Sequence, residues 1–304
     1  MHASPIYGNH TMRVQFGDIC YALICHDAEV FDRLTKLYGI FRSDKPADTS
    51  LKLEVVERLD RAQVEAVLSQ MRMAPQGNHL IAENPAFSIA FDAASSTFTV
   101  TADRFLFDPS LKFGLMNRLF RLAYYTASRS KHQGRPPGML VHSCGILRNG
   151  QALLFAGPSE TGKSTVGRLC SEDYGLLLND ETVLLSWPHP HNHRLWVHGV
   201  PILSESPSRL NKSAPLACVL LLKQSKRIAV RRLGRKEACL RFMYQIINPA
   251  HFRQTDKRAI FSLIAEFADE VTRVTPFYEL EFTLDRNLLW EVEAKLTELE
   301  ITEK

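Results

Sequence analysis

Apolar and polar residues alternate through much of the first hundred positions, a pattern typical of half-buried β-strands. This alternation predicts strands over residues 12–17, 19–26, 51–59, 86–92 and 96–102. Two shorter segments, 28–37 and 62–71, repeat apolar residues every three or four positions and are predicted helices. Together these elements predict an N-terminal α+β module over residues 1–105, in which we find no motif of known chemistry.

A long helix is predicted over residues 109–129, because a proline opens it and leucines recur along one side. The stretch KHQGRPPG at 131–138 is the most loop-like part of the chain, so a helix and linker are expected over 106–138. Beyond it, apolar strands alternate with helices, and the chain as a whole is predicted to be an α/β protein whose second domain spans 139–304. Strands are expected at 139–148, 151–156, 194–203, 214–223, 227–233 and 277–284, two apolar runs within 174–187, and helices at 163–170, 236–247, 256–271 and 286–299.

A glycine-rich loop follows the apolar strand predicted at 151–156 and leads into a predicted helix. It matches the phosphate-binding pattern G-x-x-x-x-G-K-[ST] in full. Glycines let such a loop turn its backbone N–H groups toward phosphate oxygens, and the helix N-terminus adds a positive dipole. The loop therefore predicts binding of ATP through Gly157, Pro158, Ser159, Glu160, Thr161, Gly162, Lys163, Ser164 and Thr165.

Two adjacent carboxylates, Asp180 and Glu181, lie between the apolar runs 176–178 and 183–185. Carboxylates at the end of a buried strand are costly unless a cation or hydrogen bonds satisfy them. A Mg²⁺ ion beside the nucleotide would do so, and Ser164 and Asp180 are then the expected metal ligands. A polar hairpin turn between the two apolar runs is the alternative interpretation of the same residues.

A third feature is His142, which precedes Lys163 by twenty-one residues, whereas Asp180 follows that lysine by seventeen. A lone histidine on an apolar strand is about as often structural as functional. The combined pattern nevertheless resembles the HPr serine kinase/phosphorylase family, which is related to phosphoenolpyruvate carboxykinase. The resemblance covers 139–203 and is carried by His142, Gly145, the loop at 157–165 and the LNDETV segment at 178–183.

The resemblance implies an HPr-kinase-like P-loop core with a mixed sheet. It implies an ATP- and Mg²⁺-dependent kinase that transfers the γ-phosphoryl group to a serine hydroxyl of a peptide or small protein. Later strands look similar to the short HPr-kinase-like proteins of peptide-modification systems, such as lasso-peptide kinases, so a precursor peptide of a natural-product pathway is an expected substrate. His142 would lie beside the reacting phosphoryl group, and one carboxylate would orient or deprotonate the acceptor. The catalytic residues implied are His142, Lys163, Asp180 and Glu181.

Three departures from the family pattern narrow this expectation. Thr165 stands where the family usually has glutamate, and Glu181 stands where it has aspartate. The glycine-rich segment tied to the reverse, phosphorolytic reaction is not recognisable after residue 194. Neither phosphorylase activity nor HPr itself as a substrate is therefore expected.

Two other functions stay open at this point. Small-metabolite kinases acting on a sugar or polyol share the G-K-[ST] loop and a downstream acidic group, although they usually lack a leader of this length. A non-catalytic nucleotide-binding sensor would bind ATP with Mg²⁺ and transfer no phosphate.

Composition adds few constraints. The formal net charge of the 304-residue chain is +4, too small to argue for a nucleic-acid partner. No apolar run is long enough for a membrane span, and the six cysteines form no CxxC pair, so a cytoplasmic protein with free thiols is expected. HPr kinases form oligomers, and a homo-oligomer stays open here. The basic run 227–236 is interpreted mainly as a solvated strand edge, and the alternating histidines 189, 191 and 193 mainly as a solvated turn.

Overall fold

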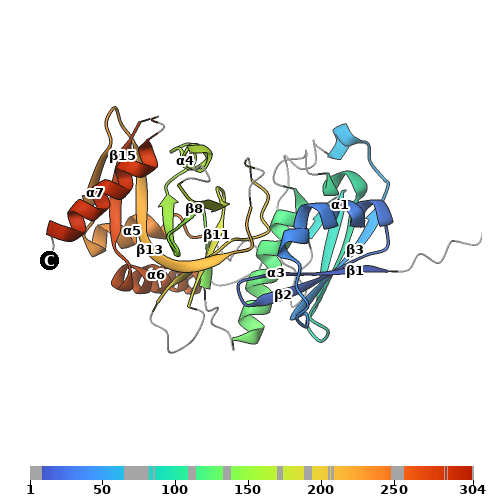
Figure 1. Cartoon of the computed structure of the whole chain (residues 1–304). Coiled ribbons are helices and arrows are strands. Elements are labelled where there is room, and N and C mark those ends of the chain that lie inside the picture. The colour runs from blue at the N-terminus through green and yellow to red at the C-terminus, as the bar shows by residue number, and fades with distance from the viewer. Residues whose placement is uncertain are drawn as a thin grey trace, which may run out of the picture. The chain divides into compact units, whose positions relative to one another are not determined.

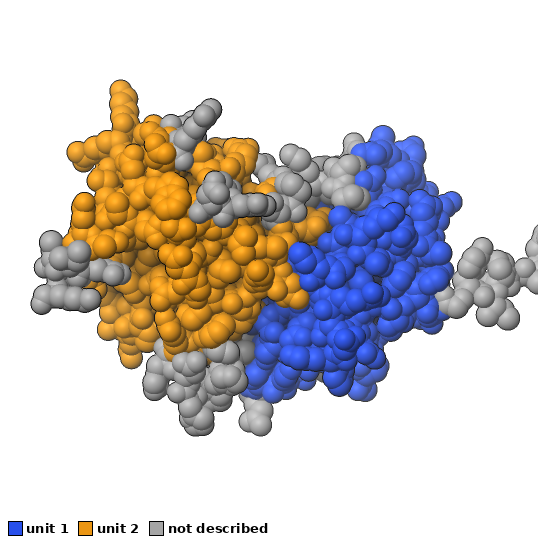
Figure 2. All heavy atoms as spheres, viewed as in Figure 1, with its two compact units in different colours: residues 1–136, 249–256 blue, residues 137–248, 257–304 orange. Residues whose placement is uncertain are grey.

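In the computed structural model the chain forms two compact units, which Figure 2 draws in different colours. Unit 1 holds the described residues through His132, and unit 2 holds those from Gly138 onward. Each unit contains a mixed β-sheet with helices, which confirms the expected α/β class. No helix in the part of the chain described is both long enough and apolar enough to cross a membrane. The described residues are 9–64, 82–84, 86–108, 114–132, 138–169, 174–187, 194–204, 206, 209–247, 257–283, 285 and 287–302.

The sheet of unit 1 has six strands in the order β1-β2-β3-β6-β5-β4. The pairs β2–β3 and β3–β6 are parallel, and the other neighbours are antiparallel. Each strand predicted in this part of the sequence is present, within a few residues at the ends. The strands are β1 (His10–Phe16), β2 (Ile19–Cys25), β3 (Thr49–Val56), β4 (Ala82–Asn84), β5 (Phe87–Asp92) and β6 (Thr97–Asp103).

Two α-helices of unit 1 lie wholly within the described residues: α1 (Ala28–Tyr38) and α3 (Leu115–Lys131), shown in Figure 1. Helix α3 was expected in the connecting segment 106–138, but its Phe120 ring packs edge-on against Phe16 and Tyr38 in the core of unit 1. Its predicted start at residue 109 lies outside the described residues, as does most of the helix predicted at 62–71. Short 3₁₀ turns occupy Gly39–Phe41 and Arg104–Phe107.

The sheet of unit 2 is centred on the long strand β13. The second half of β13 pairs in parallel with β9 and β15, and its first half pairs in antiparallel fashion with β12. The remaining neighbours extend this sheet in the order β10-β8-β9-β13-β12-β11-β7, with β14 beyond β15. The strands are β7 (Gly138–Val141), β8 (Ser143–Arg148), β9 (Gln151–Ala156), β10 (Leu176–Asn179), β11 (Val183–Ser186), β12 (Trp196–His198), β13 (Ser213–Gln224), β14 (Ala229–Arg232) and β15 (Phe277–Phe282).

The helices of unit 2 are α4 (Lys163–Leu169), α5 (Arg235–Met243), α6 (Lys257–Val274) and α7 (Leu288–Thr302). Val166 of α4 and Val292 of α7 are fully buried in one apolar cluster with Phe155, Leu220 and Leu280 of the parallel strands. This packing fixes the start of α4 at the end of the parallel strands (Figure 1).

The segment predicted as one strand over 139–148 is instead two strands separated at His142. Strand β7 pairs with β11, whereas β8 pairs with β9 and β10. The strand predicted at 194–203 is also shorter, spanning Trp196–His198. It ends before Gly199, where a Cβ atom would lie 1.8 Å from the carbonyl oxygen of Leu210, so another part of the chain crosses there.

Candidate functional site

The glycine-rich loop lies where three parallel strands end. It leaves β9 after Ala156, which pairs with Leu221 near the end of β13. Phe282, the last residue of β15, lies against the same loop. Ligands of α/β sheets bind beyond the carboxyl ends of parallel strands. The position of the loop is therefore that of a ligand site.

Both glycines of the loop are required by its geometry. A Cβ atom at Gly157 would lie 2.6 Å from the Thr161 hydroxyl oxygen. Gly162 has φ +105°, and a Cβ there would lie 2.5 Å from Cζ of Phe282. The Thr161 hydroxyl also donates to the Pro158 carbonyl at 2.7 Å, which closes the loop on itself.

Glu160 adopts a left-handed conformation with φ +66°, which is unfavourable for a residue with a side chain. Its carbonyl accepts a hydrogen bond of 2.9 Å from the Gln224 side-chain amide, and its own side chain is exposed. The backbone N–H groups of Ser159, Glu160 and Gly162 have no acceptor among the described residues. Unpaired N–H groups in such a turn form an anion-binding concavity.

Lys163 is the first residue of α4, and only 5% of it is exposed. Its Nζ donates to the carbonyls of Gly157 and Pro158, both at 2.8 Å. Burial lowers the pKa of the Lys163 ammonium group, and the neighbouring Glu181 carboxylate opposes that shift. The next two side chains, Ser164 and Thr165, are partly exposed.

Asp180 is held at a sharp bend that Asn179 organises. The Asn179 amide donates to the Ile202 carbonyl at 2.9 Å, and its oxygen accepts from the backbone N–H groups of Glu181 (2.8 Å) and Thr182 (3.0 Å). The strands on either side of this bend, β10 and β11, pair with different neighbours. A hairpin turn, the alternative interpretation, is therefore wrong.

The Asp180 side chain is 2% exposed and packs against α4. A Cβ at Gly167, one turn after Lys163, would lie 3.0 Å from Cβ of Asp180. The Oδ1 atom of Asp180 is buried and has no hydrogen-bond partner among the described residues. An unpaired buried carboxylate oxygen costs free energy that a bound cation would recover. The donor set thus fits a Mg²⁺ ion, with the Ser164 hydroxyl as the second candidate ligand.

His142 and Glu181 face each other across the break between β7 and β8. The Nδ1 atom of His142 lies 2.9 Å from the Glu181 carbonyl oxygen and 3.4 Å from its carboxylate oxygen Oε1. A carbonyl oxygen only accepts, so Nδ1 carries the proton and Nε2 of a neutral ring has a free lone pair. The backbone N–H of His142 donates to the Gln245 carbonyl at 2.8 Å, which anchors this residue from the other side.

The structure thus brings together the predicted residues Lys163, Asp180, Glu181 and His142. Sequence reasoning assigned no role to the residues that support them, which are Asn179, Gly167, Gln224, Gln245 and Phe282. Of these, Gly167 could have been noticed in the sequence, because a glycine one helical turn after the lysine indicates a close approach of another part of the chain. The histidines 189, 191 and 193 lie outside the described residues, within which no group of three or more His, Cys, Asp or Glu side chains is arranged to hold a metal ion.

Comparison with known proteins places the chain by family. No curated protein matches it. Among solved structures, the HPr(Ser) kinase/phosphatase from Coxiella burnetii is similar over 54% of this chain and 97% of that chain, with 11% sequence identity and a TM-score of 0.31. A TM-score this low does not establish a shared fold. The profile of the family described as SynChlorMet cassette protein ScmC matches residues 113–297, more than half of the chain, and the protein therefore belongs to the ScmC family.

Proposed function

We propose that this protein is an ATP- and Mg²⁺-dependent kinase that phosphorylates a serine hydroxyl of a peptide or small protein. The observation that carries the proposal is the buried carboxylate of Asp180. Its unpartnered Oδ1 lies in a side chain packed against α4, one turn beyond Lys163, at the end of a complete phosphate-binding loop. A nucleotide-bound cation accounts for the loop and for the carboxylate together.

The loop and the start of α4 would bind the triphosphate. The N–H groups of the loop face oxygens of the phosphates, and Lys163 exchanges one of its carbonyl partners for a phosphate oxygen. Ser164 and Asp180 would hold Mg²⁺, which when bound neutralises charge on the phosphates. Since the loop glycines have no room for a side chain, substitutions at these positions would disturb the phosphate-binding geometry.

Glu181 is the residue we assign to the acceptor. Asp180 is 2% exposed and lies behind α4, whereas the Glu181 side chain is 23% exposed and can reach a substrate arriving from solvent. In the transfer, the serine oxygen forms a bond to the γ-phosphorus, and the bond from that phosphorus to the departing ADP oxygen breaks. The serine proton passes to the Glu181 carboxylate, whose Oε1 atom lies 3.4 Å from Nδ1 of His142.

The proposal is tested by incubating the protein with γ-labelled ATP, Mg²⁺ and serine-containing peptides. We expect label on the peptide, and a loss of about 100-fold or more for Asp180→Asn and for Glu181→Gln. Asp32→Asn is the matched control, because Asp32 forms an exposed ion pair with Lys36 on α1 and should leave the rate unchanged.

Other outcomes would support one of the alternative functions or contradict the proposed one. Label on a sugar or polyol with none on any peptide would indicate a small-metabolite kinase. Tight binding of ATP with Mg²⁺ but no transfer to any acceptor would indicate a nucleotide sensor. Asp180→Asn transferring phosphate as fast as the wild type would remove the role assigned to Asp180.

A further inference from the structure

One segment of unit 2 connects the two halves of the candidate site. The β14–α5 segment (Gln224–Gln245) begins where the Gln224 side chain donates to the Glu160 carbonyl of the phosphate loop at 2.9 Å. It ends where the Gln245 carbonyl accepts from the backbone N–H of His142 at 2.8 Å. One end of the segment is therefore next to the phosphate loop, and the other end is next to the acceptor residues.

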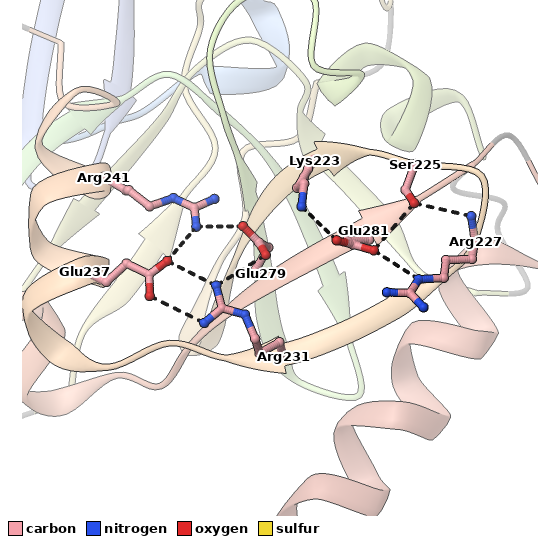
Figure 3. A network of polar contacts seen from close by, with 8 residues as sticks. All are labelled: Lys223, Ser225, Arg227, Arg231, Glu237, Arg241, Glu279 and Glu281. Carbon is pink, nitrogen blue, oxygen red and sulfur yellow. Dashed lines mark hydrogen bonds and ion pairs between the residues drawn. The ribbon is translucent and has the colours of Figure 1, made fainter.

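The segment is strongly basic. It holds seven arginines and lysines and one acidic residue, Glu237. Several of these cations pair with carboxylates of β15, as Figure 3 shows: Arg227 contacts Glu281, and Arg231 contacts Glu279. The exposed Lys226 and Lys236 have no carboxylate partner among the described residues. The segment thus keeps positive charge that its own contacts do not use.

The ion pairs of Figure 3 hold α5 in place beside the sheet. Glu237 contacts both Arg231 of β14 and Arg241 of α5, and Glu279 of β15 contacts the same two arginines. These four charges form a network, which supports a stabilising effect better than isolated exposed ion pairs do. The outer face of α5 is therefore presented in a fixed orientation.

That outer face is apolar near the site and basic farther away. Leu240 is 64% exposed and Tyr244 is 87% exposed, and Tyr244 directly precedes Gln245. Lys236, Leu240 and Tyr244 are four residues apart, so they share one side of the helix. At 1.5 Å per residue they span about 12 Å, the length of about four residues of an extended peptide.

We infer that the outer face of α5 is the docking site for an acidic, partly apolar segment of the peptide substrate. An apolar side chain of the substrate packs on Leu240 and Tyr244, and a carboxylate about four residues farther along pairs with Lys236. The acceptor serine then lies beside Glu181. The assignment of an acceptor rests on the proposed kinase function, whereas docking itself does not require catalysis.

Binding is measured first, by fluorescence anisotropy with labelled twelve-residue peptides. Each peptide has one serine, one leucine and two glutamates, with the glutamates before the serine in one peptide and after it in the other. We expect the peptide with one of the two orders to bind. Its affinity should fall about tenfold when glutamine replaces its glutamates, and also when the protein carries Lys236→Glu or Leu240→Ser. Affinity should also fall with added salt.

Lys212→Glu is the control, since Lys212 is exposed and precedes β13 at the end opposite the phosphate loop. It makes the same charge change and should leave peptide binding unaltered. Equal binding of glutamate and glutamine peptides, equal losses in the control, or equally tight binding of a twelve-nucleotide RNA would overturn the docking site.

Phosphate transfer is then measured with the same peptides, at saturating ATP. We expect Lys236→Glu and Leu240→Ser to raise KM for the peptide about tenfold while kcat and KM for ATP stay near wild type. If no peptide is phosphorylated but the acidic peptide still binds through α5, the kinase proposal fails and the docking site stands. If neutral peptides are phosphorylated as well as acidic ones, the docking site fails and the kinase proposal stands.

Discussion

Replacing Asp180 by asparagine should make the ligand-free protein more stable while removing its response to nucleotide. Asparagine has nearly the same shape as aspartate but no charge. The Asp180 side chain is 2% exposed, and its Oδ1 atom has no hydrogen-bond partner among the described residues. The substitution therefore removes a buried carboxylate with one unpaired oxygen, without opening a cavity.

The magnitude follows from the cost of an unsatisfied buried polar group, about 1–3 kcal/mol and more for a charged one. The amide still needs partners, so we expect the substitution to recover about 1–2 kcal/mol of that cost. For a domain of this size, 1 kcal/mol corresponds to roughly 2–4 °C in Tm. Asp180→Asn should thus melt about 2–8 °C above the wild type in the absence of nucleotide.

Ligand reverses the order of stability. At a concentration one hundred times Kd, Mg²⁺ with ATP should stabilise the wild type by about 2.7 kcal/mol. The variant lacks the carboxylate proposed to bind Mg²⁺ and should gain much less. Scanning calorimetry should give the variant the higher Tm in EDTA. With Mg²⁺ and a non-hydrolysable ATP analogue, the wild type should have the higher Tm.

Glu181→Gln is the comparison, because the Glu181 side chain is adjacent in sequence but 23% exposed. It should change the Tm without nucleotide by less than about 2 °C, the effect expected for a partly exposed substitution. The reasoning is refuted if Asp180→Asn has a lower Tm than the wild type without nucleotide. It is also refuted if Mg²⁺ and the analogue raise the Tm of the variant as much as that of the wild type.

Three further substitutions test the geometry around the loop. Gly162→Ala should destabilise unit 2 by about 2–3 kcal/mol in urea denaturation, because φ is +105° and the new Cβ would lie 2.5 Å from Phe282; a Phe282→Leu second substitution should restore part of the loss. Asn179→Ala should cost about 3 kcal/mol by the same measurement, because it removes three hydrogen bonds that the Asn179 side chain makes. Glu160→Gly should strengthen ATP binding severalfold in calorimetric titration, because it removes a carboxylate beside the phosphates and relieves a φ of +66°; unchanged or weaker binding would contradict this.

Backbone geometry that depends on neighbouring residues has a local signal in the sequence. Asn149 and Gly150 join β8 to β9 with φ values of +49° and +75°. Such values belong to a two-residue hairpin turn that Asn-Gly favours. Gly162 of the glycine-rich loop likewise has a positive φ, +105°, although its close approach to Phe282 depends on a residue far away in the sequence.

The break at His142 depends on contacts that are distant in sequence, and the pattern could not show it. The run MLVHSCGIL contains no proline and reads as one strand. In the structure Val141 forms a bridge with Ile246, and His142 N–H donates to Gln245, so the chain leaves one set of partners and joins another. The histidine is placed by residues one hundred positions later in the chain.

The different environments of Asp180 and Glu181 also depend on contacts that the sequence pattern does not show. Neighbouring carboxylates look equivalent in the sequence, and the pattern left open which of them would act on the acceptor. The Asn179 side chain binds the backbone N–H groups of Glu181 and Thr182 and so fixes a bend after Asp180. One carboxylate is then buried against Gly167 of α4, and the other turns toward His142 at the surface. A residue with no chemistry of its own thus separates the metal-binding role proposed for Asp180 from the proton-accepting role proposed for Glu181, and Asn179 should be as intolerant of substitution as the carboxylates that it positions.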